Sequence, residues 1–289
     1  MNEPNYEAGF KKINSVFDHE AEVVSIWDAA DLQDADRSPD RFPIGFNAFS
    51  DIMKGGVADG DLIVISGKTG HGKTTFAQTL SYHFNKIGIP QLWFSYEVEI
   101  SELREKFKDM GLDKTFVGYT PLKIKSGNVE WLEERIQEGI TKYNTKVVFI
   151  DHLGFLTPKD LGSRDYNQNL SAYLGHITRQ IKNLARDNRI IIFMLAHTKK
   201  TRETLEIEDI SHSGGIAQES DFVFMVERIP VERNIRSKSD LDQGEVLSPF
   251  TRISLQKNRR TGITKFIKCK LANGRLMENI NLDESFKMS

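Results

Sequence analysis

One segment carries the strongest chemical signal in the chain, and it reads GKTGHGKT over residues 67–74. It matches the phosphate-binding pattern G-x-x-x-x-G-K-[ST] in full. Glycines at these spacings let backbone N–H groups face phosphate oxygens, while the lysine suits the β- and γ-phosphates and the final threonine suits Mg²⁺. We therefore expect ATP or another nucleoside triphosphate to bind here with Mg²⁺. The predicted contacts are Gly67, Lys68, Thr69, Gly70, His71, Gly72, Lys73, Thr74 and the following Thr75.

A second part of the phosphate site is expected at the end of a buried strand. Asp151 ends the apolar run VVFID over residues 147–151, and a strand-end carboxylate can hold Mg²⁺, usually through water. Asp151 and Thr74 are therefore the predicted metal ligands. A strand-end aspartate also starts turns in any α/β fold, and it is the phosphate-binding segment upstream that favours the metal role. The neighbouring His152 is predicted to be structural.

Hydrolysis also needs a group that orients the attacking water. Glu97 follows the strand-like run QLWFS over residues 91–95, and His197 follows IIIFML over residues 190–195. Because the carboxyl ends of parallel strands line the ligand crevice, both side chains can reach the γ-phosphate. Glu99 is a weaker candidate for the same role. The alternative is that the two glutamates are a solvated pair opening the next helix and that the histidine is structural.

The elements that position these residues follow from hydrophobic periodicity. Apolar runs at 61–66, 91–95, 147–150, 190–195 and 222–226 alternate with helical patterns at 73–87, 129–140 and 170–184. Such alternation is typical of a parallel sheet that helices cover on both faces. Apolar and polar residues alternate in 252–256 and 265–271 around a turn at Gly262, which indicates a closing antiparallel hairpin. We predict an α/β fold with a mostly parallel central sheet, flanking helices and this C-terminal hairpin.

Residues 1–40 differ in composition from the remainder, residues 41–289. They are acidic from Asp18 to Asp40 and carry two short apolar clusters with the spacing of short amphipathic helices. We predict an N-terminal arm or linker followed by one larger domain. The arm packs either on its own core or on a neighbouring subunit, and the two alternatives stay open.

Composition excludes several classes of protein. The chain has 289 residues and a net charge of −2, so its overall charge gives no support for electrostatic coating of duplex DNA. Its one cysteine, Cys269, excludes a disulfide framework and a thiolate zinc site, and fits a reducing compartment. No apolar run reaches the roughly 18 residues of a membrane span, and no secretory signal begins the sequence. We expect a cytoplasmic protein, in a bacterial or phage-infected cell, with no membrane partner.

Beyond the phosphate site, the motifs resemble the replicative DNA helicases of the DnaB type, bacterial and phage, including phage primase-helicases. The matching segments, in family order, are GKTGHGKT (67–74), FSYE (94–97), VVFID (147–151), LAHTKK (195–200), DISHSGGIAQESD (209–221) and LQKNRRTG (255–262). The resemblance covers about residues 41–278. It implies a RecA-like motor that hydrolyses NTP between the subunits of a hexameric ring or spiral. It also implies 5′-to-3′ translocation on single-stranded DNA and unwinding of duplex in DNA replication.

The resemblance implies roles for individual residues. Glu97 becomes the catalytic base, His197 the γ-phosphate sensor, and Gln218 a conformational relay in contact with the nucleotide. The catalytic set predicted in this way is Lys73, Glu97, Asp151, His197, Lys257 and Arg259.

Two of these residues, Lys257 and Arg259, are implied to reach the γ-phosphate of the neighbouring subunit. Because the sequence has two adjacent arginines, Arg260 is an alternative to Arg259. A cation supplied in trans raises NTPase rates by about 10³–10⁵ and makes hydrolysis conditional on assembly. The alternative is a solvated hairpin turn.

Two segments that follow strand ends, 158–166 and 199–212, are expected to contact DNA. In RecA-type rings, loops at such places line the central hole, and we expect sequence-independent contact with the phosphates of a single strand. Both segments also contain acidic residues, so a solvated charged loop is the alternative. The predicted contacts are Lys159, Arg164, Lys199, Lys200 and Arg202.

Other functions share the same core motifs. A RecA- or RadA-like recombinase or a KaiC-like ATPase forms filaments or signals, and a nucleotide-gated assembly or loading factor binds nucleotide without unwinding. Family members usually carry another N-terminal domain, whereas this chain has an arm of about 40 residues. We therefore expect a phage, plasmid or accessory helicase that relies on a separate primase, loader or polymerase. Residues 228–248 are predicted to be a surface excursion.

Overall fold

The structure is a computed structural model that describes residues 25, 40–125, 129–156, 166–198, 205–210, 213–230 and 247–278. The chain divides into two units, Met1–Asp40 and Arg41–Ser289. The predicted arm lies outside the described residues, apart from Ser25 and Asp40. The second unit contains all the residues predicted to take part in catalysis.

A nine-stranded sheet, counted over the described residues, forms the centre of the second unit. Its order is β11-β10-β9-β8-β3-β7-β6-β4-β5. The strands are β3 (Leu62–Gly67), β4 (Gln91–Ser95), β5 (Gly118–Tyr119), β6 (Val147–Asp151), β7 (Ile191–His197), β8 (Phe222–Pro230), β9 (Leu247–Asn258), β10 (Lys265–Ala272) and β11 (Arg275–Glu278). Neighbours from β8 to β5 pair in parallel, and those from β8 to β11 pair antiparallel. A separate antiparallel pair joins β1 (Arg41–Phe42) to β2 (Val57–Ala58).

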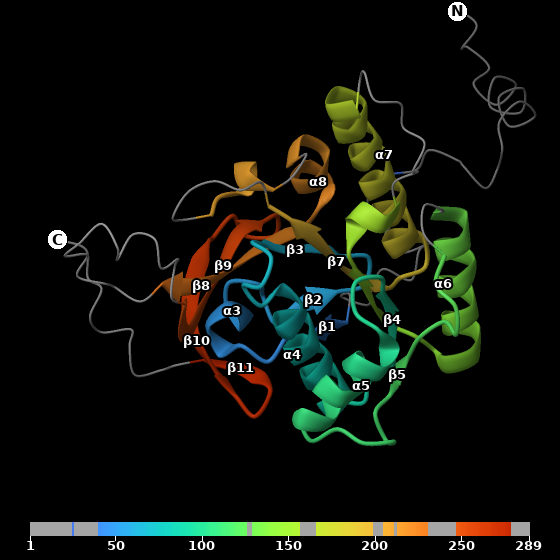
Figure 1. The fold of residues 1–289 in the computed structure, drawn as a ribbon. Helices are drawn as coiled ribbons and strands as arrows, with labels where there is room; N and C mark the ends of the chain where they lie inside the picture. Colours follow the sequence, from blue (N-terminus) through green and yellow to red (C-terminus); the bar gives the residue numbers. More distant parts are fainter. Residues whose placement is uncertain are drawn as a thin grey trace, which may run out of the picture. The chain divides into compact units, whose positions relative to one another are not determined.

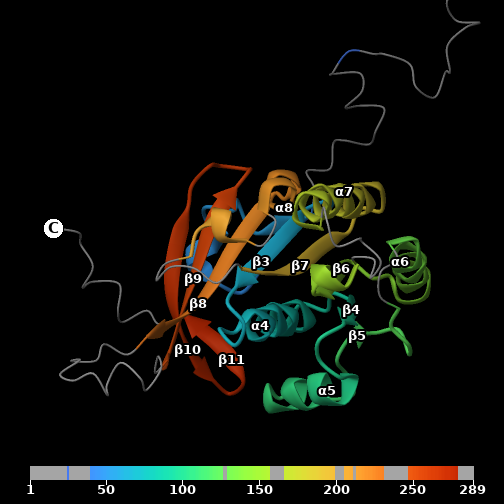
Figure 2. The same cartoon turned by 45° about the horizontal axis from the view of Figure 1, so that its top comes forward.

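Helices cover both faces of this sheet (Figure 1, Figure 2). One hydrophobic core contains residues of α3 (Asn47–Ser50), α4 (Lys73–Lys86) and α5 (Ile100–Asp109), and the other contains residues of α6 (Val129–Tyr143), α7 (Tyr166–Asp187) and α8 (Ser213–Glu219). Short 3-10 turns are η2 (Leu153–Leu156) and η3 (Ile207–Asp209). Within β3, Ile63 and Ile65 enter the first core, while Leu62 and Val64 enter the second. Burial on both faces explains why the central strands are continuous apolar runs in the sequence.

The predicted α/β fold is confirmed, with its mostly parallel sheet and its C-terminal antiparallel hairpin. β9 and β10 form the hairpin around a turn at Gly262, whose φ of 72° favours glycine. β11 adds an antiparallel strand that the sequence pattern did not predict. The excursion predicted at 228–248 was too long, because β8 extends to Pro230 and β9 begins at Leu247. Residues 231–246 lie outside the described residues.

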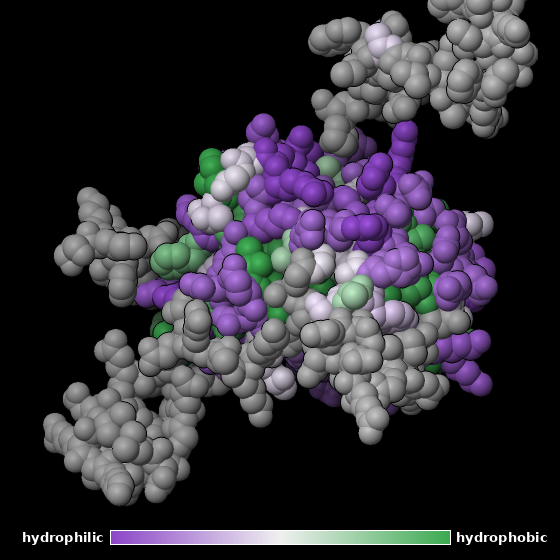
Figure 3. All heavy atoms as spheres, turned by 90° about the horizontal axis from the view of Figure 1, so that it is seen from above, coloured by the Kyte–Doolittle hydropathy of each residue, from purple (hydrophilic) through white to green (hydrophobic). Residues whose placement is uncertain are grey.

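The described surface is largely hydrophilic on the face seen in Figure 3, where hydrophobic residues form small separate patches. Charged residues make up 28% of the chain, and long charged side chains commonly cover the outer faces of helices. Among the described residues, no helix combines the length and the apolar composition needed to cross a bilayer.

The only cysteine in the sequence provides a test of the sheet packing. Cys269 is fully buried on β10, and burial raises the pKa of its thiol to about 12. Because the thiolate is the reactive form, we expect the native protein to resist iodoacetamide near neutral pH and to react after unfolding in urea. Mass spectrometry of the alkylated chains measures both states.

The matched control for this test is Leu271→Cys on the same strand, where the native side chain is 52% exposed. This variant should take up one label rapidly in its native state and a second only after unfolding. Rapid labelling of native wild-type protein would show that Cys269 does not face the core.

Candidate active site

The phosphate-binding segment joins the end of β3 to the start of α4. Gly70 and Gly72 have φ values of 77° and 98°, in the region that favours glycine. A Cβ at Gly67 would lie 2.2 Å from the carbonyl oxygen of Val226, so β8 approaches too closely for any larger residue. No side chain caps the N-terminus of α4 and its first turn has no acidic residue. The helix therefore presents N–H groups to an anion held by the segment.

Lys73 and Thr74 occupy the first turn of α4. Lys73 is only 5% exposed, and its Nζ donates to the carbonyl oxygen of Lys68 at 3.2 Å. Burial lowers the pKa of Lys73, while the carboxylates of Glu97 and Asp151 act in the opposite direction. A buried ammonium group close to two carboxylates and to a Gly-rich turn is suited to a phosphate chain.

Asp151 fits the role of a metal ligand. It is fully buried, its Oδ2 accepts from the Thr74 hydroxyl at 2.9 Å, and its Oδ1 has no hydrogen-bond partner within the described part of the chain. Burial raises the pKa of Asp151 to about 6, although the hydrogen bond from Thr74 lowers it. A buried carboxylate without compensation is unfavourable, and a hard divalent cation would remove that penalty. Asp151 and Thr74 would thus hold Mg²⁺.

Three of the predicted nucleotide contacts differ in burial and in hydrogen bonding. His71 is 7% exposed, and its Nδ1 accepts from the backbone N–H of Arg228 at 3.1 Å. Its side chain thus joins the segment to β8, and its contact with the nucleotide stays a prediction. Thr69 is exposed at the segment's outer side, and Thr75 is half-buried in the first turn of α4.

Three side chains meet where β4, β6 and β7 end. Glu97 follows β4, His152 follows β6, and His197 is the last residue of β7. Oε1 of Glu97 lies 3.0 Å from Nε2 of His197 and 3.2 Å from Nε2 of His152. β7 is also the neighbour of β3, which leads into the phosphate-binding segment. The structure thus brings the predicted pair Glu97 and His197 together, beside the phosphate site.

His152 is the member of this cluster whose role the sequence did not predict. The available signal was its position directly after a strand end, which is the signal that singled out Glu97 and His197. Burial, with the adjacent His197, lowers the pKa of His152 to about 4, so the ring is neutral at neutral pH. Glu99, the weaker candidate for the base, is exposed at the N-cap position of α5.

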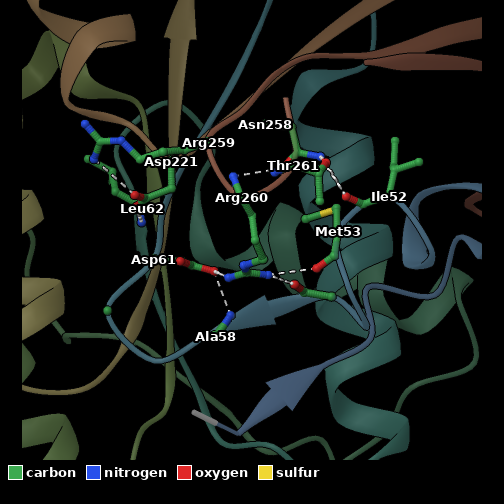
Figure 4. A network of polar contacts seen from close by, with 12 residues as sticks. Ile52, Met53, Ala58, Asp61, Leu62, Asp221, Asn258, Arg259, Arg260 and Thr261 are labelled. Carbon is green, nitrogen blue, oxygen red and sulfur yellow. Dashed lines mark hydrogen bonds and ion pairs between the residues drawn. The ribbon is translucent and has the colours of Figure 1, made fainter. Parts of the chain in front are cut away.

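The hairpin arginines have different environments (Figure 4). Arg260 donates to the carbonyl oxygens of Met53 and Gly56 and pairs with Asp61 at 2.8 Å, and its guanidinium lies 5.0 Å from the ring centre of Phe222. Its side chain is 16% exposed. These bonds hold Arg260 within its own chain, which disfavours it as the cation for a neighbouring subunit.

Arg259 lies at the edge of the sheet opposite the phosphate-binding segment. Its side chain is 56% exposed, with one contact to Asp221 at 3.4 Å. Its backbone N–H donates to Asp221, whose own N–H donates to Leu62, the first residue of β3. The phosphate-binding segment starts at the other end of that strand, at Gly67. With a rise of about 3.3 Å per residue, five steps of β3 separate the two positions by roughly 16 Å along the strand.

Lys257 is held by the end of α8. Its Nζ donates to the carbonyl oxygens of Ala217 at 2.6 Å, Gln218 at 3.0 Å and Ser220 at 2.7 Å. The last carbonyls of a helix lack partners inside the helix, and an ammonium group has three N–H donors. All three are used within the same chain. These bonds join β9 to α8, and the contact of Lys257 with the nucleotide of a neighbouring subunit stays a prediction.

The remaining predicted residues lie elsewhere. Gln218 is exposed in a hollow formed by α7 and α8, together with Gly175 and Arg179, and its contact with the nucleotide stays a prediction. The predicted DNA contacts all lie outside the described residues, and they are Lys159, Arg164, Lys199, Lys200 and Arg202.

This geometry agrees with the comparison to protein families. The model for the DnaB-like helicase C terminal domain matches residues 99–274, which are 176 of the 289 residues and more than half of the chain. The chain belongs to this DnaB-like helicase family. The matched range includes Asp151, His152, His197 and the hairpin arginines, and the phosphate-binding segment precedes it.

The relatives of this DnaB-like chain are distant. It is 25% identical over 215 residues to a probable replicative DNA helicase of Trieres chinensis, covering 62% of this chain and 45% of that one. It is 24% identical over 253 residues to the replicative DNA helicase DnaB of Haemophilus influenzae, with coverages of 73% and 52%. The DNA repair protein RadA of Streptococcus pneumoniae is 26% identical over 153 residues, with coverages of 53% and 33%. The chain thus spans about half the length, or less, of these curated relatives.

A solved structure supports the same fold. The structure of a DnaB-like replicative helicase, described with its interactions with primase, matches with a TM-score of 0.65 and 17% identity. The match covers 95% of this chain and 72% of that one. At this identity the likeness concerns the fold, in which the RecA-like sheet and the hairpin recur.

The raised pKa of Asp151 predicts a stability effect in the nucleotide-free DnaB-like chain. Because the folded pKa of about 6 exceeds the ordinary 3.8, the folded state binds the proton more tightly, and stability falls as pH rises through that interval. Near neutral pH we expect Asp151→Asn to raise the thermal midpoint by a few degrees. Scanning fluorimetry measures this, with Glu133→Gln, an exposed site on α6, as the control. An unchanged or lower midpoint for Asp151→Asn would contradict the buried, uncompensated carboxylate.

The two arginines predict stability effects of different size. Arg260→Ala leaves the Asp61 carboxylate and two carbonyl oxygens without their partner, so we expect a loss of about 2–4 kcal/mol in the free energy of unfolding. Arg259→Ala removes one exposed contact and should change it by less than about 1 kcal/mol. Urea denaturation followed by tryptophan fluorescence compares the two. Equal losses would show that the register of the hairpin turn is wrong.

Proposed function

We propose that this chain is the motor of a DNA helicase that hydrolyses ATP at the boundaries between its subunits. The subunits form a hexameric ring or spiral around single-stranded DNA, move along it from 5′ to 3′, and unwind duplex during replication. The family to which the chain belongs supports the class of activity. The shared site is supported by the positions of the phosphate-binding segment and of Arg259.

The observation that carries the proposal is the separation of these two groups. Lys73, Thr74 and Asp151 lie at the carboxyl edge of the parallel strands, and Arg259 lies at the opposite edge, beside Leu62. An arginine at that place cannot serve the nucleotide of its own chain. Its exposed side chain is suited to the nucleotide of a neighbour stacked in the same orientation. A ring or spiral of identical subunits repeats this contact at each boundary.

Each residue of the site then has a defined task. Backbone N–H groups of the phosphate-binding segment and the Lys73 ammonium bind the phosphates, while Thr74 and Asp151 would hold Mg²⁺. When bound, the ion neutralises charge on the β- and γ-phosphates. Glu97 accepts the proton of the attacking water, and His197 contacts both Glu97 and the γ-phosphate. Arg259 of the adjacent subunit stabilises the charge that develops during transfer.

The DNA and protein partners follow from the same assignment. Single-stranded DNA binds in the centre of the assembly through the segments at 158–166 and 199–212, without reading base sequence. A separate primase, loader or polymerase acts with the motor, which works in the cytoplasm of a bacterial or phage-infected cell. The DnaB-like helicase of similar fold, whose structure was described with its primase interactions, supports the primase assignment.

The shared site predicts different defects for two substitutions. Lys73→Ala removes the ammonium group that binds phosphates, so it should abolish DNA-stimulated ATP hydrolysis. Arg259→Ala leaves the chain's own binding site intact, so it should retain nucleotide binding and lose turnover by about 10³-fold or more. Steady-state hydrolysis and titration with a fluorescent ATP analogue measure the two properties.

Mixing the two variants tests whether the site is shared. A mixed ring contains boundaries where an intact Lys73 meets an intact Arg259, so mixing should restore part of the turnover that each variant lacks. Lys265→Ala, an exposed cation on β10 of the same hairpin, is the matched control and should behave as wild type. Wild-type turnover by Arg259→Ala alone is incompatible with a cation supplied in trans.

Electron microscopy with an ATP analogue and single-stranded DNA distinguishes the helicase from its alternatives. Closed rings or open spirals, together with unwinding of a forked duplex, support the proposal. Long filaments that pair homologous strands would instead indicate a recombinase, a possibility raised by the similarity to RadA. Nucleotide binding with negligible turnover would indicate an assembly or loading factor.

A further inference from the structure

Two histidines share one oxygen of the Glu97 carboxylate. Nε2 of His197 lies 3.0 Å from Oε1, and Nε2 of His152 lies 3.2 Å from the same atom. The two rings approach edge to face, with centroids 4.1 Å apart. The arrangement is compatible either with a metal ion among the three side chains or with hydrogen bonds to the carboxylate.

The backbone decides between these two possibilities at His152. The N–H of Gly154 donates to Nδ1 of His152 at 2.9 Å. A backbone N–H is always a donor, so Nδ1 carries a lone pair and the proton of the neutral ring is on Nε2. That nitrogen then donates to Glu97. A metal ligand needs a lone pair at Nε2, which would require His152 to change tautomer and lose the bond from Gly154.

His152 is also fixed by its packing. Its side chain is 13% exposed, and its ring lies against Phe155 with centroids 4.9 Å apart. A Cβ at Gly154 would lie 2.6 Å from Cε1 of His152, so only glycine lets the backbone approach this side of the ring. The imidazole is therefore held by a backbone bond, by the ring of Phe155 and by its buried position.

His197 differs from His152 in this respect. Its Nδ1 is buried and has no hydrogen-bond partner within the described residues. No backbone bond therefore selects its tautomer, and its Nε2 can donate to Glu97 or exchange that contact for another. The orientation and tautomer of His152 are therefore fixed by the backbone, whereas those of His197 are not.

We propose that His152 is a positioning residue for the catalytic base: its Nε2–H holds Oε1 of Glu97 in place while His197 exchanges between the base and the phosphate. This inference rests on the proposed function, in which Glu97 activates water for ATP hydrolysis. In this role His152 acts through Glu97 and not directly on the nucleotide. It limits the motion of the base, and a misplacement of about 1 Å can lower a rate by roughly 10²-fold.

The test compares two replacements of the same ring. His152→Phe keeps an aromatic ring but removes the donor, so kcat for DNA-stimulated hydrolysis should fall about 10- to 100-fold while the KM for ATP stays within about twofold. His152→Gln supplies an amide N–H in place of Nε2–H and should recover most of kcat. His176→Phe, an exposed histidine on α7, is the matched control. Equal kcat values for wild type and His152→Phe, or equal losses for Phe and Gln, would overturn the inference.

A double-mutant cycle shows whether His152 acts through Glu97. In a Glu97→Gln background, adding His152→Phe should cause no further loss of kcat, because residues that act as a unit are not additive. A full additional loss would mean that the ring has a separate role and would overturn the inference. Absence of turnover in wild-type protein with DNA would instead remove the base itself, and the proposed function would fail together with the inference.

One readout does not depend on turnover. The imidazole nitrogens of ¹⁵N-histidine-labelled protein report the tautomer of each ring, and His152→Gln identifies the signals of His152. We expect a protonated Nε2 and an unprotonated Nδ1 in the nucleotide-free state. A protonated Nδ1 would overturn the inference even if the protein proves to be an active helicase.

Discussion

The parallel pairing of β3 with both β7 and β8 fixes where the chemistry of this molecule lies. Pairing aligns Gly67 with His197 at one end of β3 and Ile63 with Phe222 at the other. The first end leads into the phosphate-binding segment. The second lies beside Asp221, whose carbonyl oxygen accepts from the backbone N–H of Arg259. The strand has apolar side chains on both faces, so a shift in its register would disrupt the packing of both cores. The sheet therefore separates the phosphate-binding segment from Arg259 by the length of one strand.

Several buried polar groups at the carboxyl edge of the sheet have no hydrogen-bond partner among the described residues. The buried atoms without partners among the described residues include Oδ1 of Asp151, Nδ1 of His197 and the hydroxyl of Tyr96. Burial raises the pKa of Asp151 and lowers those of Lys73 and His152. Such groups are unfavourable in the empty domain. Beside the phosphate-binding segment, such groups are expected of a site prepared for a cation and a phosphate chain, where ligand binding supplies the missing partners.

At the opposite edge, the polar side chains of the hairpin turn form several hydrogen bonds within the chain. Asn258 and Arg260 bond to the carbonyls of Ile52 and Met53, which anchors the hairpin turn to the segment after α3 (Figure 4). Lys257 closes the end of α8. These bonds leave the guanidinium of Arg259 exposed on a rigid support. They also connect α8 with the hairpin, so a displacement of the helix would move Arg259.

The sequence by itself determined the phosphate-binding segment, the alternation of strands and helices, and the acidic and histidine residues at strand ends. These signals are local: a glycine spacing, a continuous apolar run, or a side chain directly after a strand. They suffice to predict the fold, Lys73, Thr74 and Asp151, and to nominate Glu97 and His197.

Only the tertiary structure decided how the remaining residues are used. Arg259 and Arg260 are neighbours in sequence, but their side chains have different partners. Arg259 contacts Asp221, whereas Arg260 bonds to Met53 and Gly56, which lie about 200 positions earlier in the chain. From the sequence alone, Lys257 is a second basic residue next to the arginines. The structure shows that its ammonium group donates to carbonyls at the end of α8. His152 was predicted to be structural. In the structure, Glu97 after β4 and His197 at the end of β7 lie beside it, and the N–H of Gly154 donates to its Nδ1. Strand order and register set these contacts, and no local pattern in the chain encodes them.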